Sequence, residues 1–255
     1  MDNEFNEASE HNENKESLYI YDKSMVCDVC NREFLTKRIR TGKSRFLGTD
    51  EILKPLYADI DITKYDVIAC PFCGYAASER TYGRITPGQR KAIKEQIASK
   101  FSGLPKKDES YYTYDEAIRR CKMALLTVMV SHSKTSENAS LCLRLAWLYR
   151  GAAEELEREG AKQITIDKYR KNERLYIEDS YKWFVKALET EYPPIAGMKE
   201  DTLYYLLCSL GLHCGYYEDV KQFASKILSS RSADSKLKEK TRDIMDEVRN
   251  KLSPG

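Results

Sequence analysis

The chain has 255 residues, of which 42% are hydrophobic and 32% are charged, and its formal net charge at pH 7 is +2. This length provides for one large domain or two smaller ones, and the near balance of charge excludes a global electrostatic attraction to nucleic acids or membranes. The longest strongly apolar run, Met123 to Val130, is far too short to cross a bilayer, so we expect no membrane association.

The first 17 residues are polar and acidic, with six Asp or Glu residues against one Lys. They contain no apolar core, so the segment is predicted to be neither a signal peptide nor an anchor, and we expect a disordered tail. Without an export signal, the eight cysteines of the chain indicate a reducing cytoplasm. In that compartment, paired thiols bind metal more often than they form disulfides.

Residues 18–85 contain two C-x-x-C motifs that are separated by 39 residues (31 to 69). Together they predict the four ligands of a structural, tetrahedral zinc site: Cys27, Cys30, Cys70 and Cys73. In each motif a tight turn directs both sulfurs to one metal, and the residue after the second cysteine often needs positive φ. Gly74 and Asn31 occupy these positions and tolerate that conformation. Because the gap exceeds the usual zinc-finger range, we expect two separate hairpin turns clamped by one ion.

A redox function is the main alternative for the second motif. Cys70-Pro-Phe-Cys73 by itself resembles a thiol–disulfide motif at a helix N-terminus. However, Gly74 follows at once and is a poor residue for a helix, and the first motif stays unexplained. We therefore favour the structural metal site. Iron in a rubredoxin-like pair would use the same four ligands, so the sequence does not distinguish it from zinc.

The segment between the two motifs begins with a basic stretch, from Arg32 to Arg45. Its candidate phosphate contacts are Arg32, Arg38, Arg40 and Arg45. Nucleic-acid binding through this basic module is one hypothesis. A solvated loop that balances the charge of four thiolates is the favoured one, because residues 50–66 are acidic and no row of interleaved aromatic residues is present.

Residues 86–255 are predicted to be helical. Thr86-Pro87-Gly88-Gln89 and Thr113-Tyr114-Asp115-Glu116 are capping boxes that open the first two helices, which end near 103 and 131. Apolar periodicity predicts further helices at 137–159, 167–191, 199–213, 217–229 and 234–252.

Three of these helices share a spacing of four and then three between small or apolar residues. The sets are Ala117, Cys121 and Ala124; Ser180, Phe184 and Ala187; and Val220, Ala224 and Ile227. Such positions allow the close helix packing found in tetratricopeptide-type hairpins, whereas a generic helical bundle is the alternative. We therefore predict a mainly α fold, in which a small zinc-ribbon-like β module precedes a tetratricopeptide-like array of helical hairpins.

From about Met25 to Val248 the chain resembles a bacterial family known as domain of unknown function 2225. The resemblance rests on both cysteine motifs, on Tyr65-Asp66-Val67, on the segment from Leu141 to Arg150, and on Gly215-Tyr216-Tyr217-Glu218-Asp219. Cys208 and His213-Cys214 depart from the family pattern. The resemblance implies a zinc-ribbon-like head and tetratricopeptide-like helices, and it supplies no reaction.

The residue inventory gives no support for an enzyme. The chain has three histidines, none beside a recognisable nucleophile motif, and four cysteine ligands would leave no open metal position. We therefore expect a non-enzymatic, cytoplasmic zinc-binding scaffold or adaptor whose helical groove binds a protein or peptide partner. The sequence does not determine the partner or the oligomeric state.

Overall fold

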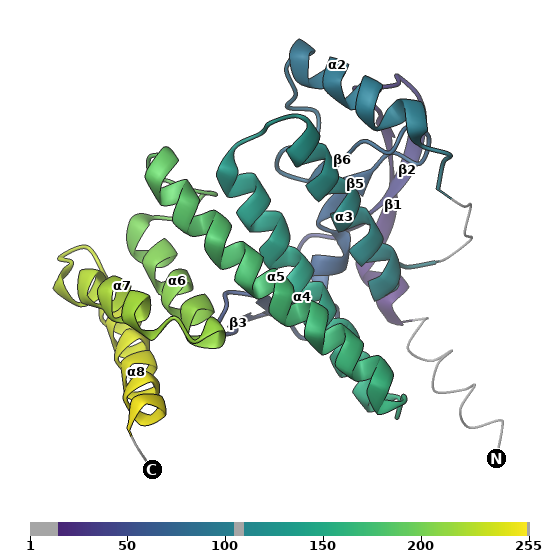
Figure 1. The fold of residues 1–255 in the computed structure, drawn as a ribbon. Coiled ribbons are helices and arrows are strands. Elements are labelled where there is room, and N and C mark those ends of the chain that lie inside the picture. Colours follow the sequence, from purple (N-terminus) through teal and green to yellow (C-terminus); the bar gives the residue numbers. More distant parts are fainter. Residues whose placement is uncertain (1–14, 105–109, 254–255) are drawn as a thin grey trace, which may run out of the picture.

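The computed structural model describes residues 15–104 and 110–253. Residues 1–14 of the predicted acidic tail lie outside the described residues, and Ser17–Tyr19 form a short 3₁₀ helix, η1. Strand pairs come first in the chain and an array of α-helices follows (Figure 1). The fold is therefore mainly α with a small β part near the N-terminus, as the sequence predicts.

Short antiparallel hairpins make up the β part. They are β1 (Ile20–Val26) with β2 (Glu33–Ile39), β3 (Phe46–Thr49) with β4 (Pro55–Tyr57), and β5 (Val67–Ala69) with β6 (Ala76–Ser78). The β1–β2 register places Val26 opposite Glu33, and the β5–β6 register places Ala69 opposite Ala76. Each C-x-x-C motif therefore lies in the turn of its own hairpin, which is the arrangement expected from the long gap between them.

The helical part contains seven α-helices within the described residues. They are α2 (Pro87–Gln96), α3 (Tyr114–Val130), α4 (Thr135–Arg158), α5 (Gln163–Thr190), α6 (Glu200–Cys214), α7 (Tyr217–Ser229) and α8 (Ser235–Leu252). Thr86 caps α2 in a reciprocal capping box with Gln89, and the Thr113 hydroxyl accepts from the Glu116 N–H at the start of α3. The largest boundary error is at α2, which ends at Gln96 and is followed by the 3₁₀ turn η3 (Ala98–Lys100), whereas the sequence predicts an end near 103. At α5 the helix starts four residues before the predicted 167, where Lys162 makes no side-chain cap.

Helices that are consecutive in the chain pack against each other from α3 to α8. The nine positions of the four-then-three spacing are at most 2% exposed and lie in these helix interfaces. Three of them bond to a partner helix. The Cys121 thiol lies 3.6 Å from the Leu141 carbonyl oxygen, the Ser180 hydroxyl donates to the Ala139 carbonyl oxygen at 3.1 Å, and the Val220 carbonyl oxygen lies 3.6 Å from the Cys208 thiol. These small residues allow the close approach that the spacing predicts, while the likeness to tetratricopeptide repeats itself stays a prediction.

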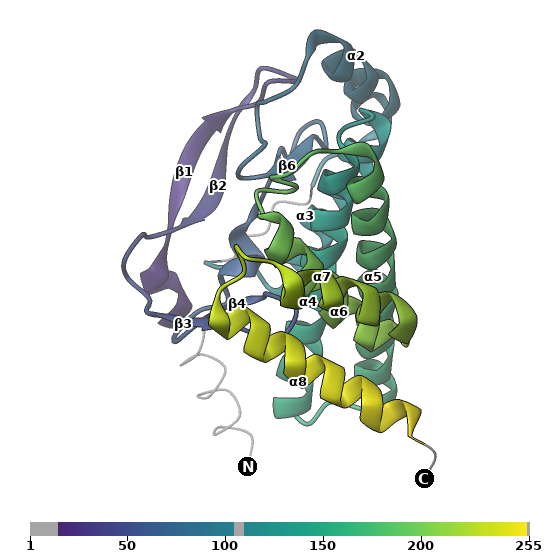
Figure 2. The same cartoon turned by 90° about the vertical axis from the view of Figure 1, so that its left-hand side faces the viewer.

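The β part and the helices share hydrophobic cores. Val67 and Ala76 belong to one buried cluster with residues of α3 and α4, and Ile93 and Ile97 of α2 and the turn after it belong to a cluster with the cysteines. The core therefore continues across the position 85/86 at which the sequence analysis placed a boundary. Figure 2 shows the β1–β2 hairpin standing along one side of the helices. None of the described helices has both the length and the apolar content that a membrane span requires.

Candidate metal centre and helical grooves

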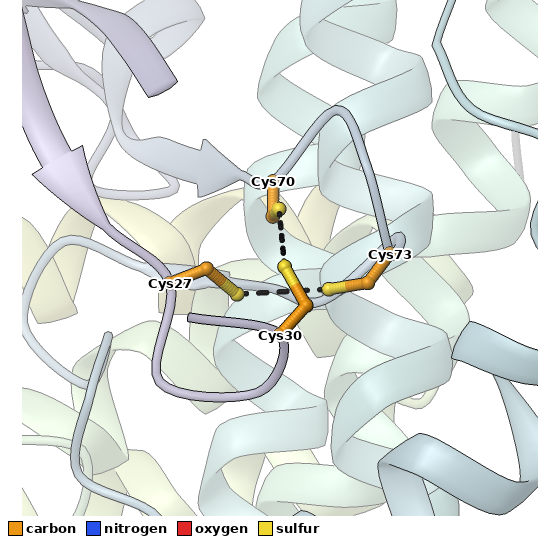
Figure 3. Close-up of side chains that lie close together, drawn as sticks. All are labelled: Cys27, Cys30, Cys70 and Cys73. Carbon is orange, nitrogen blue, oxygen red and sulfur yellow. Dashed lines mark hydrogen bonds between the residues drawn. The ribbon is translucent and has the colours of Figure 1, made fainter. Parts of the chain in front are cut away.

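The four cysteine sulfurs converge between the two hairpin turns (Figure 3). All four lie within 4.8 Å of one another, with 3.6 Å between Cys27 and Cys73 and 3.7 Å between Cys30 and Cys70. In a tetrahedral site with metal–sulfur bonds of about 2.3 Å, neighbouring sulfurs lie about 3.8 Å apart. A disulfide would need about 2.05 Å. The spacing fits one tetrahedral metal ion and no disulfide.

The two turns that hold the cysteines have the same backbone pattern. In the first, the Cys27 N–H donates to the Arg32 carbonyl oxygen at 3.0 Å and the Asn31 N–H donates to that of Cys27 at 2.8 Å. In the second, the Cys70 N–H donates to Tyr75 at 2.8 Å and the Gly74 N–H donates to Cys70 at 3.2 Å. These two bonds close each turn, so the backbone itself directs both sulfurs of a motif to the same side.

Positive φ follows the second cysteine of both motifs, as the sequence predicts: 59° at Asn31 and 76° at Gly74. At Gly74 a second constraint adds to the first. A Cβ atom there would lie 2.8 Å from Cδ2 of Phe101 and 3.2 Å from Cγ2 of Ile97. Gly74 is therefore required by its backbone conformation and by the residues after α2 that cover the second turn.

Three of the four cysteines are buried and Cys30 is half-buried, and their close contact couples the ionisation of the buried three. Hydrogen bonds from Cys70 and Cys73 lower the pKa of Cys27 far below its usual range. Donating to Cys27 raises the pKa of Cys70 to about 12 and raises the pKa of Cys73 further. Negative charge on one sulfur thus opposes ionisation of the next. Four thiolates this close together are the donor set of a soft or borderline cation, and the four cysteines can hold a metal ion.

Tyr82 is a neighbour of the cluster that sequence reasoning missed. Burial, and then the charge of Cys27, raise the pKa of its hydroxyl well above the usual range. Its ring packs on Tyr75 at 4.8 Å between centroids, and Tyr75 in turn accepts from the Gly83 N–H at 3.0 Å. Burial and the nearby Cys27 therefore favour the protonated form of the Tyr82 hydroxyl. No motif marks this residue, because the contact depends on how the turn after β6 folds back.

The four candidate phosphate contacts are not gathered into one surface. Arg32 and Arg40 flank β2 at opposite ends, about 26 Å apart for an extended strand of this length. Arg32 lies over the Phe72 ring, which links the two cysteine turns, and Arg40 donates to the Ile20 carbonyl oxygen. Arg38 is paired with Glu79, while the Arg45 side chain is exposed. Phosphate binding by these residues stays a prediction.

One groove of the helical array is filled by the chain's own 50–54 loop, which joins β3 to β4. Ile52 in this loop is completely buried in the cluster formed by α4, α5 and α6. The Trp147 indole N–H of α4 donates to the Ile52 carbonyl oxygen at 3.2 Å. Arg150 of α4 donates to Asp50 at 2.9 Å and to Glu51 at 2.7 Å. The loop therefore fixes the β part to the helices.

The contact between α4 and the 50–54 loop shows what residues 141–150, a segment that carries the family resemblance, do in the fold. Within 141–150, Arg144 pairs with Asp66 just before β5, Trp147 holds Ile52, and Arg150 holds Asp50. These residues project from one face of α4 at spacings of three. This face of α4 therefore anchors the cysteine-bearing β part to the helices.

A second groove lies on another face of the array and has a volume of about 600 Å³. We call it the α3–α5 groove. It is defined by Arg119, Lys122 and Leu126 of α3, by Lys168 and Tyr169 of α5, and by Tyr149 of α4 at its floor. None of these residues was assigned a role from the sequence, because neither a motif nor a residue type distinguishes them.

Comparison with known proteins gives a match to one family. The model of a family described as an uncharacterized protein conserved in bacteria matches residues 20–248. No curated protein and no solved structure matches the chain.

Proposed function

The chain belongs to this bacterial family, DUF2225, and on that premise we propose that it is a non-enzymatic interaction scaffold stabilised by one zinc ion. The four-sulfur cluster is the observation that carries the proposal. Zinc accepts four thiolates in a tetrahedron and has no redox chemistry, which suits a site of structural type in a reducing cytoplasm. The ion would be held by Cys27, Cys30, Cys70 and Cys73.

The placement of the cluster supports a structural role. Cys27 and Cys70 are completely buried, and Cys73 is 4% exposed. With four protein donors no coordination position is left for a substrate, in contrast to catalytic zinc sites with three. Structural zinc supplies on the order of 10 kcal/mol in small modules. The β1–β2 hairpin buries few of its side chains, whereas β5 and β6 are buried throughout, so the metal would hold the first cysteine turn to the second.

The helical array supports the scaffold proposal. Arrays of this kind expose long faces on which a peptide or a partner helix packs. The groove between α4 and α6 is filled by the 50–54 loop, so the α3–α5 groove is the face that we propose for a protein or peptide partner.

Elemental analysis of the purified protein, combined with thiol counting, tests the metal site. We expect one zinc per chain and four thiols that react only after a chelator is added. Cys70→Ser should abolish the bound zinc, whereas the control Cys214→Ser, a half-buried cysteine outside the cluster, should keep it. A metal-free protein with a reversible Cys70–Cys73 disulfide would overturn the proposal in favour of the redox alternative. If the elemental analysis finds iron, the proposed structural ion is iron and the zinc assignment is wrong.

Nucleic-acid binding is a second candidate function, favoured by the exposed Arg32 beside the first cysteine turn and the exposed Arg45 before β3. It predicts affinity for RNA or DNA that falls steeply with salt and is lost when the four arginines are neutralised. Affinity that is unchanged by their neutralisation would eliminate it, and a protein partner that still binds such a variant would support the scaffold.

A further inference from the structure

We propose that the α3–α5 groove is a docking site for an acidic peptide helix that carries aliphatic or aromatic anchors. This inference rests on the proposed scaffold function and names the chemistry of its partner. Figure 1 shows the three helices of the groove next to one another, and α4 contacts both α3 and α5. The groove therefore has two helical walls and a helical floor, which is the shape that receives another helix.

The wall formed by α3 contributes the apolar side chains of the groove. Leu126 follows Lys122 by one turn, is 49% exposed and lines the groove together with Met123. The opposite wall is formed by Lys168, Tyr169 and Asn172 of α5. From Asp115 to Leu126 the wall of α3 is about 17 Å long, which matches a partner helix of about 11 residues.

The floor of the groove is aromatic and rigid. Tyr149 stacks on Tyr176 at 5.6 Å between ring centroids and packs against Tyr169 at 5.7 Å. The Tyr169 hydroxyl donates to Asp115 at 2.6 Å and so ties α5 to α3 at one end. Rigid aromatic surface of this kind binds apolar anchors at low entropic cost.

The rim of the groove is positively charged, and this decides the kind of partner. Lys122 and Lys168 are exposed and form no ion pair with another residue of the described chain. Arg119 shares the Glu116 carboxylate of its own helix with Arg120, and the carboxylate of Asp115 accepts from the Tyr169 hydroxyl. The Lys122 ammonium lies 5.4 Å from the centroid of the Tyr149 ring, and Lys168 lines the same groove from α5. These two charges favour carboxylates on the partner, with Leu or Phe side chains between them.

Selection from a display library of random 16-residue peptides tests the inference on the full-length, metal-loaded protein. We expect the enriched peptides to carry Asp or Glu together with Leu, Ile or Phe at helical spacing. Their affinity should fall about tenfold for Lys122→Glu/Lys168→Glu, because each attraction becomes a repulsion. The control Lys236→Glu on α8 makes the same kind of charge change away from the groove and should bind as the unmodified protein does.

A charge exchange completes the test. The same peptides with Lys in place of Glu should bind Lys122→Glu/Lys168→Glu more tightly than they bind the unmodified protein. If the double reversal impairs folding, as judged by its melting temperature, Lys122→Gln/Lys168→Gln serves instead. Failure to enrich any peptide, or enriched peptides without acidic bias, would overturn the inference. Peptides whose affinity is unchanged by the lysine substitutions would overturn only the assignment of their binding site to the α3–α5 groove. Failure of the proposed function would appear instead in the elemental analysis and thiol counting.

Discussion

The second cysteine turn depends on one residue without a side chain. Gly74 has φ of 76°, and a Cβ atom there would meet the Phe101 ring at 2.8 Å. Gly160, after α4, has φ of 68° and open space around a Cβ atom. The two glycines thus share a backbone conformation and differ in their surroundings.

Replacement by alanine should separate the two effects. Gly160→Ala should lower the free energy of unfolding by about 1 kcal/mol, the cost of a left-handed conformation for a residue with a Cβ atom. Gly74→Ala should lower it by about 2–4 kcal/mol, because displacement of the Phe101 ring adds to that cost. Denaturant titration of both variants in the same metal state measures the difference. Equal losses in the free energy of unfolding at the two positions would show that the Phe101 ring can move aside at no energetic cost.

At the scale of elements, the 50–54 loop is the contact that places the β part on the helical array. Its backbone is shaped by Asp50, whose carboxylate accepts from the N–H groups of Ile52 at 3.0 Å and Lys54 at 2.7 Å. Arg150 joins this carboxylate to Glu173 of α5. The loop therefore presents Ile52 to the helices in one fixed conformation.

Truncation of Ile52 should be costly. Ile52→Ala removes a side chain with 0% exposure from the α4–α6 cluster, and we expect a loss of about 2–5 kcal/mol in the free energy of unfolding. Leu47→Ala on β3 of the same hairpin is the control, because Leu47 is 54% exposed and its truncation should have little effect. Chemical denaturation measures both. A small effect of Ile52→Ala would mean that the 50–54 loop contacts the helices but contributes little to the attachment of the β part.

Asp61, which caps the 3₁₀ helix η2 (Ile62–Tyr65), is the centre of a second contact between elements. Burial opposes its ionisation, but the Lys54 ammonium at 2.8 Å outweighs this effect, with hydrogen bonds from Thr63 and from the Tyr114 hydroxyl. The pKa of Asp61 is therefore lower in the folded protein than its ordinary value. Tyr114 is the first residue of α3, so this carboxylate ties η2 to the helices.

The lowered pKa predicts a pH dependence with a definite sign. The stabilisation by Asp61 is fully present above the unfolded pKa of about 3.9 and is lost as pH falls through the lower folded value. Asp61→Asn should therefore be less stable than the unmodified protein by about 3 kcal/mol near pH 7. The difference should shrink below pH 4. Unfolding of both proteins between pH 3 and 7 in the same metal state measures it, and a difference independent of pH would contradict the assignment.

At the scale of the whole molecule, the cysteine cluster and the helices are linked by shared cores. Ile93 and Ile97 pack in the cluster of the four cysteines, whereas Val67 and Ala76 pack with α3 and α4. Loss of the metal should therefore spread into α2 before it reaches the longer helices, because α4 to α7 pack mainly on one another.

Hydrogen exchange with and without a chelator tests this order. After metal removal, residues 20–104 should lose protection, and α4 to α7 should keep most of theirs, because the free energy of metal binding stabilises the small hairpins most directly. An unchanged exchange pattern would contradict a structural metal site. Loss of protection along the entire chain would show that the module and the array fold as one unit.

The sequence by itself determined the local features of this protein. Two C-x-x-C motifs, positive φ at Asn31 and Gly74, the capping box at Thr86 and the side-chain cap at Thr113 depend on residues within one turn of each other. The spacing of Ala117, Cys121 and Ala124 marked a helix face that is buried for the same reason. These features can be predicted from the sequence because the residues that cause each of them lie within the same short segment. The cysteine set is the extreme case, since the chemistry of one metal fixes which distant turns must meet.

Tertiary structure alone decided which surfaces are covered and which stay open. Ile52 lies in an acidic loop and shows no sign of burial in the sequence, yet it is enclosed by helices about 100 positions away through contacts such as Arg150 with Asp50. Lys122 and Lys168 are ordinary surface lysines until packing places them in one groove with Tyr149. Burial and charge complementarity belong to pairs of segments, so they appear only when the chain is folded.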